Sequence, residues 1–336
     1  MEKKFLLGCD WGTSSFRLRL YNLVAQNVSG EMHTPEGVAP TFNSWNTDDE
    51  NDAVSQEQYF RIKLREQVKV LANQLLMNLD HIPILISGMA SSTIGMQSVN
   101  YANLPFALDG SSALTIRIPP DDDFPHEIIL VSGVKSNNDV MRGEETQVLG
   151  LFSLLKKQNR FPEKAILILP GTHSKHIYIQ GNEMINFQTF MTGEIFSLLS
   201  KHSILSDSVD NSVDKSTTHQ YSDEDVKIFK KGIRFSADAS MLHNLFSVRT
   251  NQLFGVYDKR QNSIYLSGLL IGSELSHLLT EENLPILLCS SIHLHEFYTL
   301  GLAELNLLHR TTILSAEETD QITIAGQLII MNYLKN

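Results

Sequence analysis

The chain has 336 residues, of which 42% are hydrophobic, and this is long enough for two globular domains of roughly 100–200 residues each. Its 38 acidic and 27 basic side chains give a formal net charge of −11 at pH 7. Nucleic acid and anionic membranes are therefore disfavoured as main partners, because both carry the same sign of charge as the protein.

The first apolar run, residues 5–9, follows two lysines as the core of a secretion signal does. Asp10 interrupts it after about five residues, whereas a signal needs roughly 7–15. No other run approaches the ~18 apolar residues of a membrane helix. The two cysteines, Cys9 and Cys289, lie in apolar runs and are expected to be buried thiols. These features together indicate a cytoplasmic protein.

A polar turn follows the first expected strand. Residues 5–9 are apolar and residues 16–20 alternate apolar and basic side chains, which predicts a hairpin. The turn between them, from Asp10 to Ser15, is rich in small residues and hydroxyls that can offer N–H and O–H groups to an anion. Asp, Gly and Ser are also common in ordinary turns, so one copy decides nothing.

Between this hairpin and mid-chain we expect strands near 83–87 and 127–132, helices near 56–79 and 142–157, and a polar loop at 40–55. An acidic block follows the strand at 127–132 and contains Asp139, Arg142 and Glu144. Open α/β sheets bind ligands beyond the carboxyl ends of their strands, so an Asp here has the right chemistry for a general base. Helix capping by Asn138 or Asp139 explains the block equally well.

The opening hairpin recurs near mid-chain. Residues 165–169 are apolar, a Gly171-Thr172-x-Ser174 turn follows, and residues 176–180 alternate again. A repeat at half the chain length predicts two related domains rather than a solenoid, whose period is about 20–50 residues. Two such turns facing each other would hold a polyphosphate from both sides, with Asp10 organising a metal at one of them.

The rest of the chain continues the α/β pattern, which implies a mixed sheet in each half. We expect strands near 184–190, 285–289 and 311–314, a surface excursion at 202–222, and helices near 194–201, 223–231, 234–249, 263–280, 294–308 and 319–334. His173-x-x-His176 is a weak zinc candidate, because no third ligand has zinc-site spacing. Gly268 and Gly272 would allow close backbone approach of a neighbour or a purine. Neither a P-loop nor a Gly-x-Gly-x-x-Gly motif is present in the sequence.

Six blocks of the sequence together resemble the 2-dehydro-3-deoxygalactonokinase family, in the family's order and over nearly the whole chain. The blocks are 10–13, 87–89, 139–147, 170–175, 191–194 and 266–274, of which 139–147 is the most specific. The family belongs to the actin-like ATPase and sugar-kinase superfamily. The resemblance implies two ribonuclease-H-like domains with an active-site cleft between them: residues 1–160 on the sugar-acid side, and 161–336 on the nucleotide side, with the last helix free to pack back on the first domain.

The same resemblance implies a reaction: ATP-dependent phosphorylation of the 6-hydroxyl of 2-dehydro-3-deoxy-D-galactonate, in galactonate catabolism. It implies that Asp139 is the catalytic carboxylate and that Asp10 organises Mg²⁺ and phosphate. The residues it places at the sugar acid are Ser87, Gly88, Met89, Asn138, Arg142 and Glu144. Those it places at ATP are Gly12, Thr13, Ser14, Gly171, Thr172, His173, Ser174, Lys175, Gly193 and Gly268.

Two alternatives remain open from the sequence. One is a kinase for another 2-keto-3-deoxy sugar acid, such as the gluconate epimer. The other is a non-catalytic, actin-like nucleotide-binding scaffold, which would keep Asp10 and both turns but would have no use for Asp139, Arg142 and Glu144. The sequence also leaves a homodimer open.

Overall fold

The computed structural model describes residues 4–47, 54–210, 221–238, 240–281 and 283–335. The backbone divides into two compact units. The first includes the residues up to Phe161, Asn182–Ile185 and the residues from Asp320 on, and the second includes Pro162–Gly181 and Asn186–Thr319. The chain therefore returns to the first unit at its end, inside the last helix.

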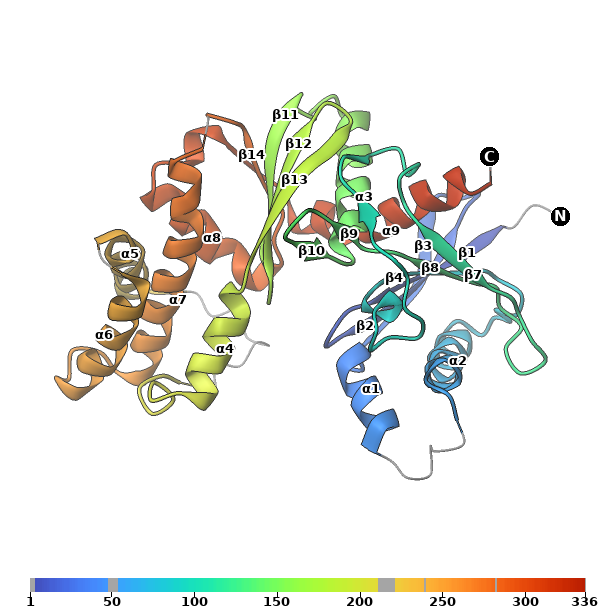
Figure 1. The fold of residues 1–336 in the computed structure, drawn as a ribbon, viewed down its shortest axis with the longest axis horizontal. Helices are drawn as coiled ribbons and strands as arrows, with labels where there is room; N and C mark the ends of the chain where they lie inside the picture. The colour runs from blue at the N-terminus through green and yellow to red at the C-terminus, as the bar shows by residue number, and fades with distance from the viewer. Residues whose placement is uncertain (1–3, 48–53, 211–220, 239, 282, 336) are drawn as a thin grey trace. The chain divides into compact units, whose positions relative to one another are not determined.

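A six-stranded mixed sheet forms the centre of the first unit, in the order β3-β2-β1-β4-β8-β7 (Figure 1). The strands are β1 (Phe5–Trp11), β2 (Phe16–Asn22), β3 (Asn27–Thr34), β4 (Ile84–Gly88), β7 (Thr115–Ile118) and β8 (Ile128–Val131). β1, β4 and β8 run parallel, so their carboxyl ends meet at one edge of the sheet. The helices of this unit are α1 (Val38–Thr47), α2 (Gln56–Leu75), α3 (Glu144–Lys157) and most of α9 (Ala316–Tyr333).

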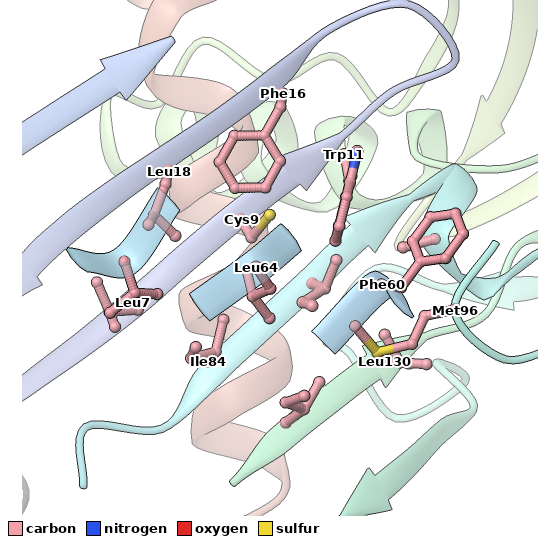
Figure 2. Close-up of a cluster of buried hydrophobic side chains, with 14 of the residues drawn as sticks. Leu7, Cys9, Trp11, Phe16, Leu18, Phe60, Leu64, Ile84, Met96 and Leu130 are labelled. Atoms are coloured by element: carbon pink, nitrogen blue, oxygen red, sulfur yellow. The ribbon is translucent and has the colours of Figure 1, made fainter. Parts of the chain in front are cut away.

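One face of this sheet packs on α2, and alternation along the strands explains why. Leu7, Cys9 and Trp11 all point to the same side of β1 and are buried (Figure 2). Phe60 and Leu64, one helical turn apart on α2, belong to the same cluster. These apolar contacts fix the position of β1 relative to α2, and therefore the position of the polar residues that follow β1.

The second unit repeats the strand order of the first. β11 (Lys164–Leu169) pairs in parallel with β14 (Ile286–Leu288), which pairs in parallel with β15 (Thr311–Ile313). On its other side β11 pairs with β12 (Ser174–Gln180), and β12 with β13 (Glu183–Phe190). The orders β3-β2-β1-β4-β8 and β13-β12-β11-β14-β15 are thus equivalent, so the duplication extends from the hairpin to the whole sheet.

The second unit also holds five α-helices in its described part, and α5 packs along α7 (Figure 1). They are α4 (Thr192–His202), α5 (Asp223–Asp238), α6 (Met241–Leu253), α7 (Lys259–Ser276) and α8 (Ile292–Glu304). The short elements are β5 (Ala102–Asn103), β6 (Phe106–Ala107), β9 (Val134–Lys135), β10 (Val140–Met141), and the 3₁₀ turns η2 (Met89–Ser91), η3 (His277–Leu279) and η4 (Leu308–Arg310). None of the helices in the described ranges has both the length and the apolar character needed to cross a bilayer.

Several expected elements differ from the structure. Part of the expected loop at 40–55 is α1, whose first turn accommodates Pro40. β3 escaped prediction because Met32 is its only buried side chain, so its alternation is weak. The expected break between helices near 231 and 234 is wrong, because α5 continues through Gly232. Residues 48–53 and 211–220, parts of the two expected loops, lie outside the described residues.

Candidate active site

Asp10 lies at the end of β1, beside the end of β4. In the parallel register Asp10 is opposite Ser87 and Trp11 is opposite Gly88. Gly88 has φ = +93°, and a Cβ there would lie 2.7 Å from the Trp11 carbonyl oxygen and 3.4 Å from Asp10 Oδ1. Only glycine fits this position, and its lack of a side chain keeps the space beside the Asp10 carboxyl open.

The start of α3 comes to the same place. Gly143, with φ = +107°, precedes the helix, and a Cβ on it would lie 3.2 Å from Gly88 Cα. The pKa of Asp10 is raised to about 6: burial raises it most, the Arg17 charge lowers it, and the Glu144 charge raises it. Glu144 therefore lies within electrostatic reach of Asp10. Two carboxylates, those of Asp10 and Glu144, therefore lie at the carboxyl edge of the first sheet. Gly88 and Gly143 have no side chains to fill the space beside them.

Glu145, the next residue, is buried and points inward. Its carboxyl accepts hydrogen bonds from the Gly143 N–H (2.7 Å) and the Thr146 hydroxyl (3.0 Å). Burial, and secondarily the Glu144 charge, raises the pKa of Glu145 to about 8. This carboxyl is therefore largely protonated at neutral pH, and it supports the start of α3 from within.

We expect Glu145→Gln to stabilise the protein increasingly as pH rises from 5 to 8.5. Unfolded Glu145 loses its proton near its ordinary pKa, whereas the folded side chain keeps it to about pH 8, so between these values the wild-type free energy of unfolding falls with pH. Glutamine has no proton to lose. Thermal melts should show a Tm gain of about 3 °C or more at pH 8.5 and little at pH 5. The exposed Glu163→Gln should show no such trend; a constant gain for Glu145→Gln would contradict the assignment.

The Asp139 block departs from its expected geometry. Asp139 does not lead directly into a helix: it lies in the turn between β9 and β10, and α3 begins only at Glu144. Its Oδ1 accepts the Val140 N–H at 2.7 Å, and its own N–H donates to Ser136 Oγ at 3.0 Å. Asn138 is exposed in the same turn. The turn therefore presents Asp139 from a short hairpin rather than from the main sheet.

Arg142 lies before α3 and not within it, because the expected helix start at 142 is two residues early. Its Nη1 donates to Ser91 Oγ (2.6 Å) and its Nη2 to the Val99 carbonyl (3.2 Å). The guanidinium also stacks on Tyr101, 4.3 Å from the ring centroid. Arg142 thus ties the block to η2, the turn that follows Gly88 and begins at Met89.

Gln327, which the sequence analysis did not single out, holds β1 and β4 together. This buried side chain of α9 donates from Nε2 to the Cys9 carbonyl (2.8 Å) and to Ser87 Oγ (3.0 Å). It thereby fixes the residues next to Asp10 and Gly88. The only signal in the sequence is a polar side chain on the apolar face of a helix. Glutamine is mostly exposed in proteins, so such a residue is usually interpreted as a surface residue.

The two Gly-Thr turns have the same backbone environment. In the first unit the start of α1 donates to the turn, from Ala39 N–H to the Thr13 carbonyl at 2.9 Å. In the second, the start of α4 donates from Glu194 N–H to the Thr172 carbonyl at 3.0 Å. A Cβ on Gly193 would lie 2.6 Å from the Gly171 carbonyl oxygen, which accounts for this glycine. The duplicated unit is thus three strands and a helix start, longer than the sequence revealed.

The exposed residues of the turns are those predicted at ATP. Thr13 and Ser14 are exposed in the first turn, and Thr172 and His173 in the second. Gly12 N–H is engaged within its own turn by the Ser15 carbonyl, at 2.9 Å. Each turn therefore offers hydroxyl or ring donors on a backbone that its neighbouring helix holds in place.

The buried side of the second turn is different. Ser174 is fully buried, and Lys175 is almost so, with its Nζ donating to the His173 carbonyl at 3.1 Å. His173 bonds to Glu194, whereas His176 is buried against Glu274, so the two rings do not converge. In the part of the chain that the structure describes, no three His, Cys, Asp or Glu side chains form a metal-binding group.

The glycines of α7 pack on a neighbouring helix. A Cβ on Gly268 would lie 2.3 Å from the Phe229 carbonyl oxygen of α5, and one on Gly272 would lie 2.9 Å from Ile233 Cα. Of the two alternatives raised by the sequence, the neighbour therefore accounts for both glycines. A nucleotide contact at Gly268 stays a prediction.

The duplicated sheet, with a Gly-Thr turn and a helix start at the same place in each unit, defines an α/β fold of the actin-like ATPase and sugar-kinase class. Residues 10–330 match the family described as 2-keto-3-deoxy-galactonokinase, and the chain belongs to this family.

Individual relatives agree. A candidate 2-dehydro-3-deoxygalactonokinase of Rhizobium meliloti is 29% identical over 272 residues, covering 80% of this chain and 78% of the relative. The 2-dehydro-3-deoxygalactonokinase of Escherichia coli is 29% identical over 203 residues, covering 58% and 61%. The crystal structure of a candidate 2-dehydro-3-deoxygalactonokinase from Sinorhizobium meliloti matches with a TM-score of 0.77 and 28% identity, over 98% of this chain and 96% of the other.

Proposed function

We propose that the protein is an ATP-dependent kinase that phosphorylates the 6-hydroxyl of 2-dehydro-3-deoxy-D-galactonate. Membership of the family supports the reaction. The structural observation that supports this reaction lies at the carboxyl edge of the first sheet. Asp10, Gly88 and Glu144 come together there, next to the exposed Thr13-Ser14 turn. A scaffold protein that only bound nucleotide would have no use for the block that contains Asp139, Arg142 and Glu144.

Phosphoryl transfer requires mainly positioning and charge neutralisation. The exposed hydroxyls of the two Gly-Thr turns are suited to phosphate oxygens. Asp10 and Glu144 fit Mg²⁺, which proteins usually hold with one or two carboxylates together with the substrate phosphates. Mg²⁺, when bound, supplies the neutralisation of phosphate charge. We assign the acceptance of the sugar hydroxyl's proton to Asp139.

The sugar acid is assigned to the first unit, at the residues around η2 and the Asp139 turn. Ser87 and Gly88 lead into η2, which begins at Met89, and Arg142 fixes that turn through Ser91. The second unit, with the turn at 171–175, is assigned to the nucleotide. That the two turns face each other stays a prediction.

Arg142→Lys should raise KM for the sugar acid roughly tenfold or more and leave KM for ATP within about twofold. The guanidinium makes two hydrogen bonds and one ring contact around η2, and an ammonium group cannot reproduce this flat, forked arrangement. Steady-state kinetics with each substrate varied in turn would test this. Arg65→Lys, on α2, is the control, because the Arg65 guanidinium donates an exposed hydrogen bond to the Asp123 carbonyl (3.2 Å). Equal changes in both KM values would place Arg142 elsewhere.

A coupled ATP-consumption assay tests the function itself. Purified protein would be offered 2-keto-3-deoxygalactonate, the gluconate epimer and unmodified aldonates. The proposal expects the highest kcat/KM with 2-keto-3-deoxygalactonate. A preference for the gluconate epimer would identify the alternative kinase, and ATP binding without turnover on any acid would identify the scaffold.

We infer a cytoplasmic location from the cysteines. Cys9 and Cys289 are both free and buried, as is usual for thiols in a reducing compartment. An ATP-dependent reaction also needs the nucleotide pool of that compartment. The homodimer stays open.

A further inference from the structure

A buried hydrogen-bond chain runs inward from the second Gly-Thr turn. The Gly171 N–H donates to Ser174 Oγ at 3.3 Å, and Ser174 Oγ lies 3.0 Å from the Tyr298 hydroxyl of α8. The Tyr298 hydroxyl donates to Glu274 Oε2 on α7 at 2.8 Å. Ser174, Tyr298 and Glu274 are each no more than 2% exposed, so the chain is closed to solvent.

The direction of the donors along this chain follows from chemistry. The Tyr298 hydroxyl carries a single proton and donates it to Glu274, so this proton is not available to Ser174. Burial and the Glu274 charge raise the pKa of Tyr298 well above its usual range, so that this proton stays in place. The bond between Ser174 and Tyr298 must therefore use the serine proton, and Ser174 has none left to donate to a phosphate.

Glu274 also forms hydrogen bonds with residues on the other side of the turn. His176 Nε2, on β12, lies 3.1 Å from Glu274 Oε1, and the Thr192 hydroxyl at the start of α4 donates to Oε2. α4 is the helix whose Gly193 packs on the turn. A buried carboxylate is costly unless its oxygens are hydrogen-bonded, and here both are. One side chain thus joins β12, α4 and α8 around the turn.

We propose that Glu274 and Tyr298 are positioning residues that hold the second Gly-Thr turn in the shape that binds nucleotide phosphate, with Ser174 serving as their inward relay and not as an ATP ligand. This inference rests on the proposed kinase function. It replaces a direct role for Ser174 with an indirect one, and it adds two residues from helices far away in the sequence.

Tyr298→Phe is the main test, because it removes one hydroxyl and keeps the buried ring. The dissociation constant for ADP, measured by calorimetry, and KM for ATP should both rise roughly tenfold. KM for the sugar acid should stay within twofold of the wild-type value. Tyr178→Phe is the matched control: it also removes a hydroxyl that donates to a glutamate, Glu281, at 2.9 Å, but from a part of β12 away from the turn. It should leave both nucleotide constants within twofold.

A double-mutant cycle with Ser174→Ala separates relay from ligand. If Ser174 acts through Tyr298, each single variant breaks the same chain, and the double variant binds ADP no more weakly than the weaker single one. The proposal would be overturned if the fold-increases in the ADP dissociation constant of the two single variants multiplied in the double variant. Equal ADP binding by Tyr298→Phe and Tyr178→Phe would also overturn it. Should Tyr298→Phe fail to fold, wild-type ADP affinity in Ser174→Ala alone would overturn it. Failure of the wild-type protein to bind ADP would instead refute the kinase function, and this inference with it.

Discussion

Asp10→Asn is expected to keep the fold and to lower kcat roughly 10²–10³-fold, the range usual for losing one preorganised group that stabilises charge in the transition state. The amide is nearly the size of the carboxyl but cannot orient Mg²⁺ or its water shell. The side chain lies at the end of β1, beside Gly88 and within electrostatic reach of Glu144. The loss should appear in kcat at saturating ATP and sugar acid.

The stability of Asp10→Asn provides the check that the fold survives. The raised pKa of Asp10, about 6, means that ionising this group destabilises the folded state, and the cost grows as pH rises from its ordinary pKa to 6. At pH 7.5 the asparagine variant should therefore melt at or above the wild-type Tm, with the difference shrinking below pH 6. Asp80→Asn, at an exposed position, is the control and should change neither quantity. Wild-type kcat in Asp10→Asn would make residues 10–15 an ordinary turn.

The mixed sheets could be predicted from the sequence because their signals are local. Two apolar runs, each followed by a Gly-Thr turn and an alternating strand, suffice to locate both hairpins, and buried strands have the same composition wherever they occur. The equivalence of the two strand orders then follows from the duplication. The six blocks that resemble the family supplied the reaction, which no local pattern could.

The features that could not be predicted from the sequence depend on contacts between residues far apart in the chain. Glycine often ends a helix, yet Gly232 lies inside α5. A Cβ there would lie 2.5 Å from the Tyr265 carbonyl oxygen of α7. Its purpose is visible only once the two helices are side by side. Gln327 and Glu274 are likewise buried polar residues of helices, and their partners lie far away along the chain. Hydrogen bonds of this kind leave no periodicity for the sequence to show.

The Asp139 block shows how a correct motif can have the wrong local geometry. Residues 142–157 have helical composition, but Gly143 needs φ = +107°, which ends the preceding segment and delays the helix to Glu144. Glu144 and Glu145 consequently occupy the first turn of α3, where acidic residues are favoured by the helix dipole. Glu144 lies within electrostatic reach of Asp10, and it is the rival to Asp139 as general base.

Asp139→Asn is expected to lower kcat roughly 10²–10⁴-fold while KM for both substrates stays within about threefold, because a positioned base contributes this much by taking the hydroxyl proton in the transition state. The asparagine keeps an oxygen for the Val140 N–H, so the turn between β9 and β10 should hold its shape. Rapid-quench measurement of the first turnover would show the loss in the chemical step, with ATP still bound.

Glu144→Gln is the matched variant that decides between the two carboxylates. It too keeps an oxygen for its backbone donor, the Arg142 N–H at 3.0 Å. Because Glu144 shares the electrostatic environment of Asp10, we expect this change to raise the Mg²⁺ concentration needed for half-maximal rate and to leave kcat at saturating Mg²⁺ within about tenfold of the wild-type value. The reverse pattern, with Asp139→Asn turning over normally and Glu144→Gln inactive at every Mg²⁺ concentration, would make Glu144 the base and the Asp139 turn a structural hairpin.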